Sequence, residues 1–67
     1  MRIQYDFDLD ETTQTALDGA LYEYGLDVYI WWENQEKRLL TEHAPIVADL
    51  EKLLAELQIT YHKTITE

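Results

Sequence analysis

Residues 26–41 read L-D-V-Y-I-W-W-E-N-Q-E-K-R-L-L-T, and this stretch near the middle of the chain predicts a β-hairpin. Its first part, residues 26–32, is rich in β-branched and aromatic residues, a composition typical of strands. The polar residues 33–36 supply a turn, and residues 37–41 form the second strand of the hairpin. The rest of the fold follows from what flanks this hairpin on each side.

On the N-terminal side, a helix is predicted over residues 11–24. Asp10 is suited to cap its first turn, and Gly25 supplies the left-handed residue that often ends a helix. The apolar face of this helix has the spacing i, i+3, i+4, i+7 and consists of Leu17, Ala20, Leu21 and Tyr24. Before the helix, residues 2–9 alternate in polarity, which predicts a strand with one buried face. Its buried side chains are Ile3, Tyr5, Phe7 and Leu9.

On the C-terminal side, the same sequence of elements is repeated. Pro45 fits the first turn of a second helix, which extends to about Gln58. A wide apolar stripe along this helix comprises Ile46, Val47, Leu50, Leu53, Leu54 and Leu57. Residues 59–66 then alternate again and predict a last strand. Its inward side chains are Ile59, Tyr61 and Ile65, and its outward ones are Thr60, His62 and Thr64.

The predicted order is therefore βαββαβ, and residues 1–67 form a single domain. Over its whole length this order resembles the ferredoxin-like α+β fold. The resemblance implies a four-stranded antiparallel sheet in the order 4-1-3-2, with both helices on one face. The other face of the sheet is then open to solvent. Many unrelated functions share this fold, so it predicts architecture and not activity.

The two-residue period of a strand predicts which side chains lie on the open face. The first strand offers Gln4, Asp6 and Asp8, and the second offers Asp27, Tyr29, Trp31 and Glu33. The opposite parity places Val28, Ile30 and Trp32 against the helices. Because both faces of the second strand are apolar, a slip of one residue exchanges Trp31 for Trp32 on the open face.

Net charge narrows the classes of partner. The formal charge is −9, and residues 1–33 hold eight acids against Arg2 alone. Such a field repels nucleic acid and anionic membranes and attracts basic proteins. No apolar run is long enough to span a bilayer and no signal peptide precedes the first strand, so we expect a soluble, cytoplasmic protein. The chain has no cysteine, which excludes disulfides and thiolate metal sites.

No catalytic or metal-binding pattern is complete, so we expect a non-enzymatic protein without a cofactor. Asp6, Asp8 and Asp10 resemble the start of an EF-hand calcium loop, but the glycine position is Glu11 and the last ligand position is Leu17. The segment F-D-L-D-E-T at 7–12 resembles the first motif of haloacid-dehalogenase-type phosphatases, again with Glu11 in place of glycine. The chain has no room for that family's further motifs.

The two histidines argue against a metal site, and the third strand argues against an RNA-binding site. His43 and His62 lack the spacing of metal ligands. We expect His43 to help cap the second helix, and His62 to lie beside an aspartate of the first strand, where the first and last strands pair. RNA-recognition domains with this fold carry aromatic residues on the third strand. Here that strand reads K-R-L-L at residues 37–40, which argues against direct nucleic-acid binding.

What remains is an acidic surface that carries aromatic residues. Asp6 and Asp8, two apart on a strand, are roughly 6.6 Å from each other, comparable to successive phosphates of a nucleic acid. We expect Asp6, Asp8, Asp27 and Glu33 to supply the electrostatic attraction to a basic protein, and Tyr29 and Trp31 to anchor it.

In size and acidity the chain resembles, as a class, the small inhibitors that phages make, including anti-CRISPR and DNA-mimic proteins. The resemblance implies a stoichiometric inhibitor that occludes a basic nucleic-acid-binding surface, acting in the host cytoplasm if the chain is phage-encoded. The alternative is a homodimeric regulatory or scaffold domain that pairs through the aromatic strand, with room for a small ligand at the interface. Neither reading assigns a catalytic residue.

Overall fold

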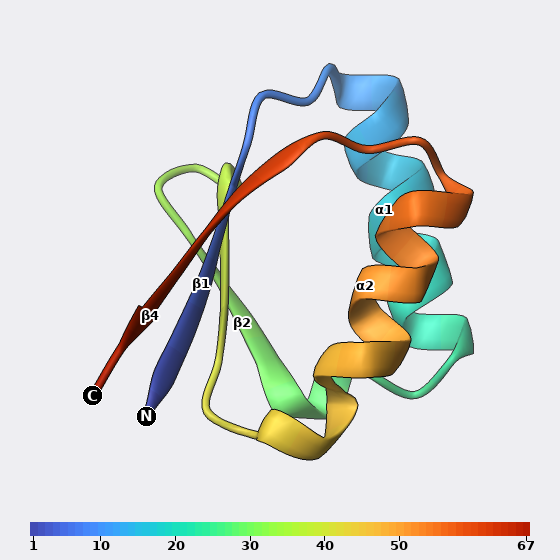
Figure 1. The fold of residues 1–67 in the computed structure, drawn as a ribbon. Coiled ribbons are helices and arrows are strands. Elements are labelled where there is room, and N and C mark those ends of the chain that lie inside the picture. The colour runs from blue at the N-terminus through green and yellow to red at the C-terminus, as the bar shows by residue number, and fades with distance from the viewer.

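The elements of the fold follow the order β1, α1, β2, β3, α2, β4 in a computed structural model that describes residues 1–67. The strands are β1 (Arg2–Phe7), β2 (Ile30–Glu33), β3 (Arg38–Thr41) and β4 (Tyr61–Thr66). The helices are α1 (Glu11–Glu23) and α2 (Val47–Glu56), with short 3-10 turns η1 (Asp27–Tyr29) and η2 (Ala44–Ile46). All strand pairs are antiparallel and the sheet order is β2-β3-β1-β4, which confirms the predicted ferredoxin-like order (Figure 1).

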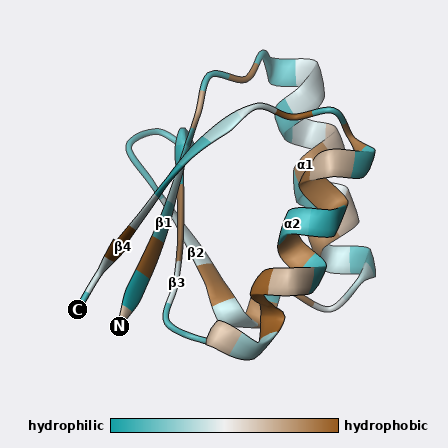
Figure 2. Ribbon diagram, in the orientation of Figure 1, coloured by the Kyte–Doolittle hydropathy of each residue, from teal (hydrophilic) through white to brown (hydrophobic).

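Both helices lie on the same side of the sheet, and the core fills the space between the two layers. The side chains of β1 that point toward the helices, Ile3, Tyr5 and Phe7, are all buried, as their alternation predicts. Apolar residues of α1 and α2 face these strands (Figure 2). The helical contribution to the core is Leu17, Leu21, Leu50, Leu53 and Leu54.

The predicted ends of the first helix are confirmed. A side-chain oxygen of Asp10 accepts a 2.7 Å hydrogen bond from the backbone N–H of Thr13, which satisfies a free donor of the first turn. Gly25 adopts φ +73°, the left-handed conformation that closes the C-terminal end. The backbone N–H of Leu26 then donates to the carbonyl of Leu21 at 2.9 Å.

The prediction that the second strand begins at residue 26 is wrong, because β2 begins at Ile30. The N–H of Leu26 completes the cap of α1 and is not free to join a sheet ladder. Asp27–Tyr29 then forms a 3-10 turn. As a result Val28, expected to face the helices, is 75% exposed.

The last strand is shortened for the same physical reason. Gln58 adopts φ +58° after α2, and the N–H of Ile59 donates to the carbonyl of Leu54 at 2.9 Å. The ladder of β4 therefore starts at Tyr61 and not at residue 59. Ile59 is nevertheless buried in the core, as its inward assignment predicts. Pro45 lies in the 3-10 turn that leads into α2.

The structure resolves which tryptophan faces which side of the sheet. Trp32 is opposite Leu39 and its ring centroid lies 6.0 Å from that of Phe7, on the helix side. Trp31 is opposite Leu40, on the open face. The assignment of Trp31 to the open face and Trp32 to the core is thus confirmed.

Candidate protein-binding surface

One row of side chains crosses the open face of the sheet, and acidic and basic residues alternate along it. The strand register places Glu33 beside Arg38, Arg38 beside Asp6, and Asp6 beside His62. The Nε of Arg38 donates to a carboxylate oxygen of Asp6 at 2.9 Å. The expected meeting of His62 with an aspartate is therefore confirmed in register, with Asp6 as the partner.

Among the acids on this face, Asp6 accepts the most hydrogen bonds from neighbouring side chains. Gln4 donates from Nε2 to one carboxylate oxygen at 2.8 Å, and Arg38 donates to the other. These two hydrogen bonds lower the pKa of the Asp6 carboxyl below its ordinary value. Asp6 is therefore charged near neutral pH, but much of its field is cancelled by Arg38.

Trp31 lies in the next row, where it meets a second base. The row continues from Trp31 through Leu40 and Gln4, and Leu40 is 1% exposed although it points to the open face. The guanidinium carbon of Arg2 is 5.9 Å from the centroid of the indole ring, within cation–π range. The Nε1 of Trp31 donates to Glu33 at 3.4 Å. Trp31 is consequently half-buried and already has partners within the chain.

The expectation that the open face is an anionic surface is therefore wrong. Asp6 and Glu33 on this face are accompanied by the two cations Arg2 and Arg38. The charge count over residues 1–33 missed Arg38, which β3 places next to Asp6. The aromatic residue Trp31 is where the sequence predicts it, but the field around it is mixed.

Three of the six predicted partner-binding residues lie outside the sheet. Asp8 is exposed but follows the end of β1, so it does not stand in a row with Asp6. Asp27 and Tyr29 belong to η1 and not to β2, which contradicts their predicted place on the open face. Tyr29 stacks on His43 with ring centroids 4.3 Å apart. His43 occupies the N-cap position of η2, where its carbonyl accepts a 3.2 Å hydrogen bond from the N–H of Ile46, but its side chain makes no capping hydrogen bond.

The C-terminal end of α1 and the turn that follows it carry exposed aromatic residues and acids that form no ion pair. At the C-terminal end of α1, Tyr22 is 77% exposed and Tyr24 is 63% exposed. Tyr24 was expected on the buried face, but it is the residue that caps the helix end and its ring remains accessible. Glu23 and Asp27 lie in the same stretch, and both are exposed. We name this the α1-end surface; its members are Tyr22, Glu23, Tyr24, Asp27 and Val28.

The electrostatics of the α1-end surface favour a cation. The last turn of α1 contains no basic residue, and its final residue is the acid Glu23. The C-terminal end of a helix already carries a partial negative charge, roughly half an elementary charge. The charge of Glu23 therefore adds to the partial negative charge of the helix end, and no base in the last turn of α1 offsets it.

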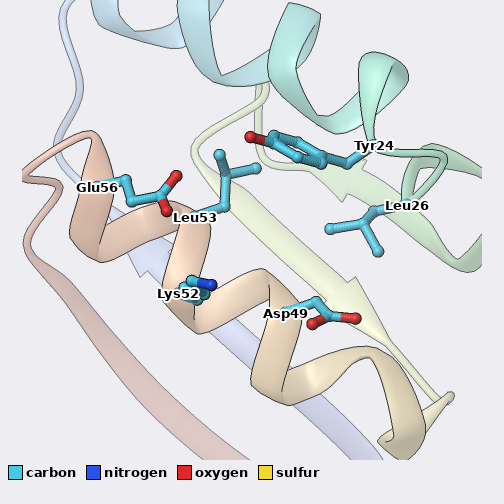
Figure 3. Close-up of a pocket in the computed structure, with 6 residues that line it drawn as sticks. All are labelled: Tyr24, Leu26, Asp49, Lys52, Leu53 and Glu56. Carbon is cyan, nitrogen blue, oxygen red and sulfur yellow. The ribbon is translucent and has the colours of Figure 1, made fainter.

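Tyr24 also forms one wall of a cleft between the end of α1 and α2 (Figure 3). The cleft has a volume of about 260 Å³, smaller than typical small-molecule pockets, which begin at about 300 Å³. The opposite wall is formed by α2, including Asp49 and Glu56 with Lys52 between them. The cleft therefore combines one aromatic face with two carboxylates and one ammonium group.

A second cluster of titratable groups joins β1, β4 and α2 on the helix side of the sheet. Glu51 accepts hydrogen bonds from the hydroxyl of Tyr5 at 2.8 Å, the hydroxyl of Tyr61 at 3.3 Å and the Nζ of Lys63 at 2.6 Å. Tyr5 is fully buried, and desolvation together with the Glu51 carboxylate raises the pKa of its hydroxyl. These hydrogen bonds link β1, β4 and α2 to one another.

The structure contains no group of three or more acidic, histidine or cysteine side chains arranged to hold a metal ion. Neither helix has the length and apolar character needed to cross a membrane. Comparisons with protein-family models, with characterised proteins and with solved structures found no significant match to this chain. Function is therefore argued from the surface alone.

Tyr22 and Tyr24 were not among the predicted partner-binding residues. Tyr22 falls outside the apolar stripe of its helix, and a large aromatic residue off the stripe is a signal for an exposed contact residue. Tyr24 falls on the apolar stripe of its helix, where residues are normally buried, so its exposure could not be predicted from the sequence. Asp27 is the one predicted partner-binding residue that the structure places within the α1-end surface.

Proposed function

We propose that this protein is a non-enzymatic, acidic protein-binding module that docks on a basic surface of another protein. The observation that supports this most directly is the α1-end surface, where exposed tyrosines and unpaired carboxylates coincide. Tyrosine side chains give a large contact area at low entropic cost and are common among residues that dominate binding energy. The acids select a cationic partner and speed the encounter.

The charge distribution supports a basic partner. Of the fourteen acids, only Asp6 and Glu51 form ion pairs within the chain. No lysine or arginine occurs between Arg2 and Lys37, a stretch that includes the whole of α1 and η1. The field in front of this part of the molecule is therefore strongly negative. Such a field raises the association rate with positively charged proteins and weakens as salt is added.

The basic surfaces that fit this charge pattern are those that contact nucleic acid. A protein that covers such a surface prevents DNA or RNA from binding and so acts as a stoichiometric inhibitor. In class, this resembles the small acidic phage inhibitors, including anti-CRISPR and DNA-mimic proteins, whose site of action is the host cytoplasm. The remaining predicted residues, Asp6, Asp8, Tyr29, Trp31 and Glu33, stay predictions as further contacts.

The alternative, a homodimer that pairs through the aromatic strand, has less support. β2 has only four residues, and Trp32 packs in the core of its own chain. Trp31 is half-buried beneath Arg2. Neither indole therefore offers the large free apolar area that a dimer built on this strand requires.

Capture of partners from a cell extract, followed by mass-spectrometric identification, tests the proposal. We expect a cationic nucleic-acid-binding protein that binds with one-to-one stoichiometry in calorimetry and is released by competing DNA or RNA. A double variant, Glu23→Lys with Asp27→Lys, should lose this partner. The matched control, Glu36→Lys with Glu67→Lys, makes the same change in net charge at two exposed acids away from the α1-end surface and should retain it. Partners that are not cationic, or that bind nucleic acid and this protein simultaneously, contradict the proposal.

A further inference from the structure

The edge of the sheet formed by β4 is exposed along most of its length. β4 pairs with β1 on one side only, and residues His62–Thr66 are all exposed. An edge strand presents unpaired backbone N–H and C=O groups that can pair with another strand. The opposite edge, β2, is shorter and is followed by three residues with positive φ, Asn34, Gln35 and Glu36.

The usual devices that protect an edge strand are missing from β4. The strand contains no proline, and its register with β1 is continuous from Tyr61 to Thr66, without a bulge. Lysine side chains often guard such edges. Lys63, however, points to the helix side and is held by Glu51 at 2.6 Å. The edge is therefore free to accept another strand.

The register tells which backbone groups point outward. The N–H of Phe7 donates to the carbonyl of Lys37, so odd-numbered residues of β1 direct their backbone groups toward β3. The even-numbered residues of β1 then bond to β4, where their partners include His62 and Thr64. The backbone N–H and C=O groups of Lys63 and Ile65 consequently project from the free edge.

The charge of β4 indicates what kind of strand it accepts. β4 contains no acid, so it offers nothing specific to a basic partner. Most other surfaces of a chain with net charge −9 would bring carboxylates together if they met their own copies. β4 is the one edge strand where a second copy of the chain can approach without that repulsion. The β4 edge and the α1-end surface are therefore expected to bind different partners, a second copy of the chain and a basic protein respectively.

We propose that two copies of this chain pair antiparallel through β4, centred on Thr64, and form a continuous eight-stranded sheet. A two-fold axis perpendicular to the sheet keeps both helix layers on the same side, so paired residues must share a face. Centring on Lys63 would place that lysine opposite its own copy, which is unfavourable. Centring on Thr64 pairs Thr64 with the partner's Thr64, His62 with the partner's Thr66, and Lys63 with the partner's Ile65.

The proposed register also covers an exposed apolar side chain. Ile65 is 54% exposed although it points to the helix side. In the dimer, the aliphatic stem of the partner's Lys63 lies beside it. The contact is small compared with interfaces of about 1,200–2,000 Å², so we expect a weak dimer that forms at high protein concentration.

The salt dependence of this dimer is opposite to that of docking on a basic partner. Pairing brings two negatively charged molecules together, so added salt screens the repulsion and strengthens the dimer. Docking of the α1-end surface on a cation weakens with salt for the same reason. The dimer does not depend on the proposed docking on a basic protein, so an experiment that rules out one of these two proposals leaves the other unaffected.

Disulfide cross-linking tests the register, because the chain has no cysteine of its own. Thr64 faces its own copy in a pair without backbone hydrogen bonds, with Cα atoms about 4.5 Å apart, and this distance lies within the range for a disulfide. Thr64→Cys should therefore give a covalent dimer on mild oxidation. The matched control is His62→Cys, which lies on the same face but opposite the partner's Thr66, and it should cross-link about tenfold more slowly. Equal rates for the two variants would overturn the register.

Sedimentation equilibrium tests the dimer itself. We expect the dimer fraction to rise between about 0.02 M and about 0.5 M NaCl. Ile65→Pro removes an outward N–H without removing a bond to β1, and should raise the dissociation constant by about tenfold or more. Ile65→Thr keeps that N–H and should retain the dimer. A chain that is monomeric at all concentrations and salts, with a normal circular dichroism spectrum, contradicts the proposal even if the proline variant fails to fold.

Discussion

The hydroxyl of Tyr5 donates a 2.8 Å hydrogen bond to the carboxylate of Glu51, which lies 46 residues further along the chain. This bond links the first strand to the second helix beneath a fully buried aromatic ring. Lys63 extends the link to β4, with its Nζ 2.6 Å from the same carboxylate. Two strands and a helix are therefore tied to a single acid, and the stability of the domain should be sensitive to each of its partners.

Tyr5→Phe removes the hydroxyl and keeps the ring, so it isolates the contribution of this hydrogen bond to the free energy of unfolding. We expect the free energy of unfolding to fall by about 1–2 kcal/mol, the range for a bond to a charged group that water can partly replace. Tyr61→Phe is the matched control, because its hydroxyl is 3.3 Å from Glu51 and the residue is less buried. Urea denaturation measures both. A larger loss for Tyr61→Phe than for Tyr5→Phe would mean that the bond of Tyr5 is not the dominant one.

The same cluster predicts how stability depends on pH. Hydrogen bonds from Lys63 and from Tyr5 lower the pKa of Glu51 below its ordinary value of 4.5. The stabilisation by the Glu51 carboxylate is therefore complete above the unfolded-state pKa and is lost as the pH falls through the lower pKa of the folded state. Glu51→Gln should be less stable than the natural protein at pH 7, and the difference should shrink below pH 4.5. The comparison cancels the general effect of protonating the other acids.

The measurement is a series of urea denaturations of both proteins from neutral to acidic pH. A difference that stays constant into the acid range would show that Glu51 stabilises the fold through packing and not through its charge.

The two glycines of the chain should respond to the same substitution with opposite signs. An added Cβ meets no atom within 4 Å at either Gly19 or Gly25, so sterics do not separate them. Gly19 lies inside α1, where alanine is favoured by about 0.5–1 kcal/mol. Gly25 has φ +73°, where a side chain costs about 1–2 kcal/mol. Thermal unfolding should show Gly19→Ala stabilised and Gly25→Ala destabilised.

The two adjacent tryptophans provide another matched pair. Trp32 packs against Phe7 in the core, so Trp32→Ala should lower the free energy of unfolding by about 2–4 kcal/mol, a large part of the stability of so small a domain. Trp31 lies on the open face, partly covered by Arg2, and Trp31→Ala should cost about half as much. Comparable losses in chemical denaturation would imply that the open face is packed as firmly as the core.

Much of the fold was predictable because local signals agreed with one another. The alternation of Ile3, Tyr5 and Phe7, the cap at Asp10 and the stop at Gly25 all have their physical causes within a few residues. The predictions failed at Leu26 and Ile59, two apolar residues that follow a helix and were expected to begin a strand. In each case the backbone N–H closes the end of the preceding helix, and an apolar side chain packs equally well in either arrangement. Hydrophobic pattern alone cannot separate a helix cap from the start of a strand.

The candidate site was less predictable, because its charges depend on pairing between distant strands. That Asp6 lies beside Arg38 follows from the register of β1 with β3, and a shift of one residue would have separated them. The exposure of Tyr24 depends on where α1 ends, since one further turn would have changed the position of its ring. By contrast, the acids Glu23 and Asp27 and the lack of any lysine or arginine between Arg2 and Lys37 were visible in the sequence.

Binding kinetics with a captured basic partner should separate the two kinds of residue on the α1-end surface. Glu23→Gln removes a charge that acts at long range, so it should slow association and reduce the dependence of the association rate on salt. Tyr24→Ala removes a contact that forms only after docking, so it should speed dissociation by about tenfold with little effect on association. Tyr24→Phe is the control, because it keeps the aromatic wall of the cleft and should dissociate at nearly the natural rate. Surface plasmon resonance at several salt concentrations measures all three. If Glu23→Gln acts only on dissociation, the acid makes a direct contact and the steering role assigned to it is wrong.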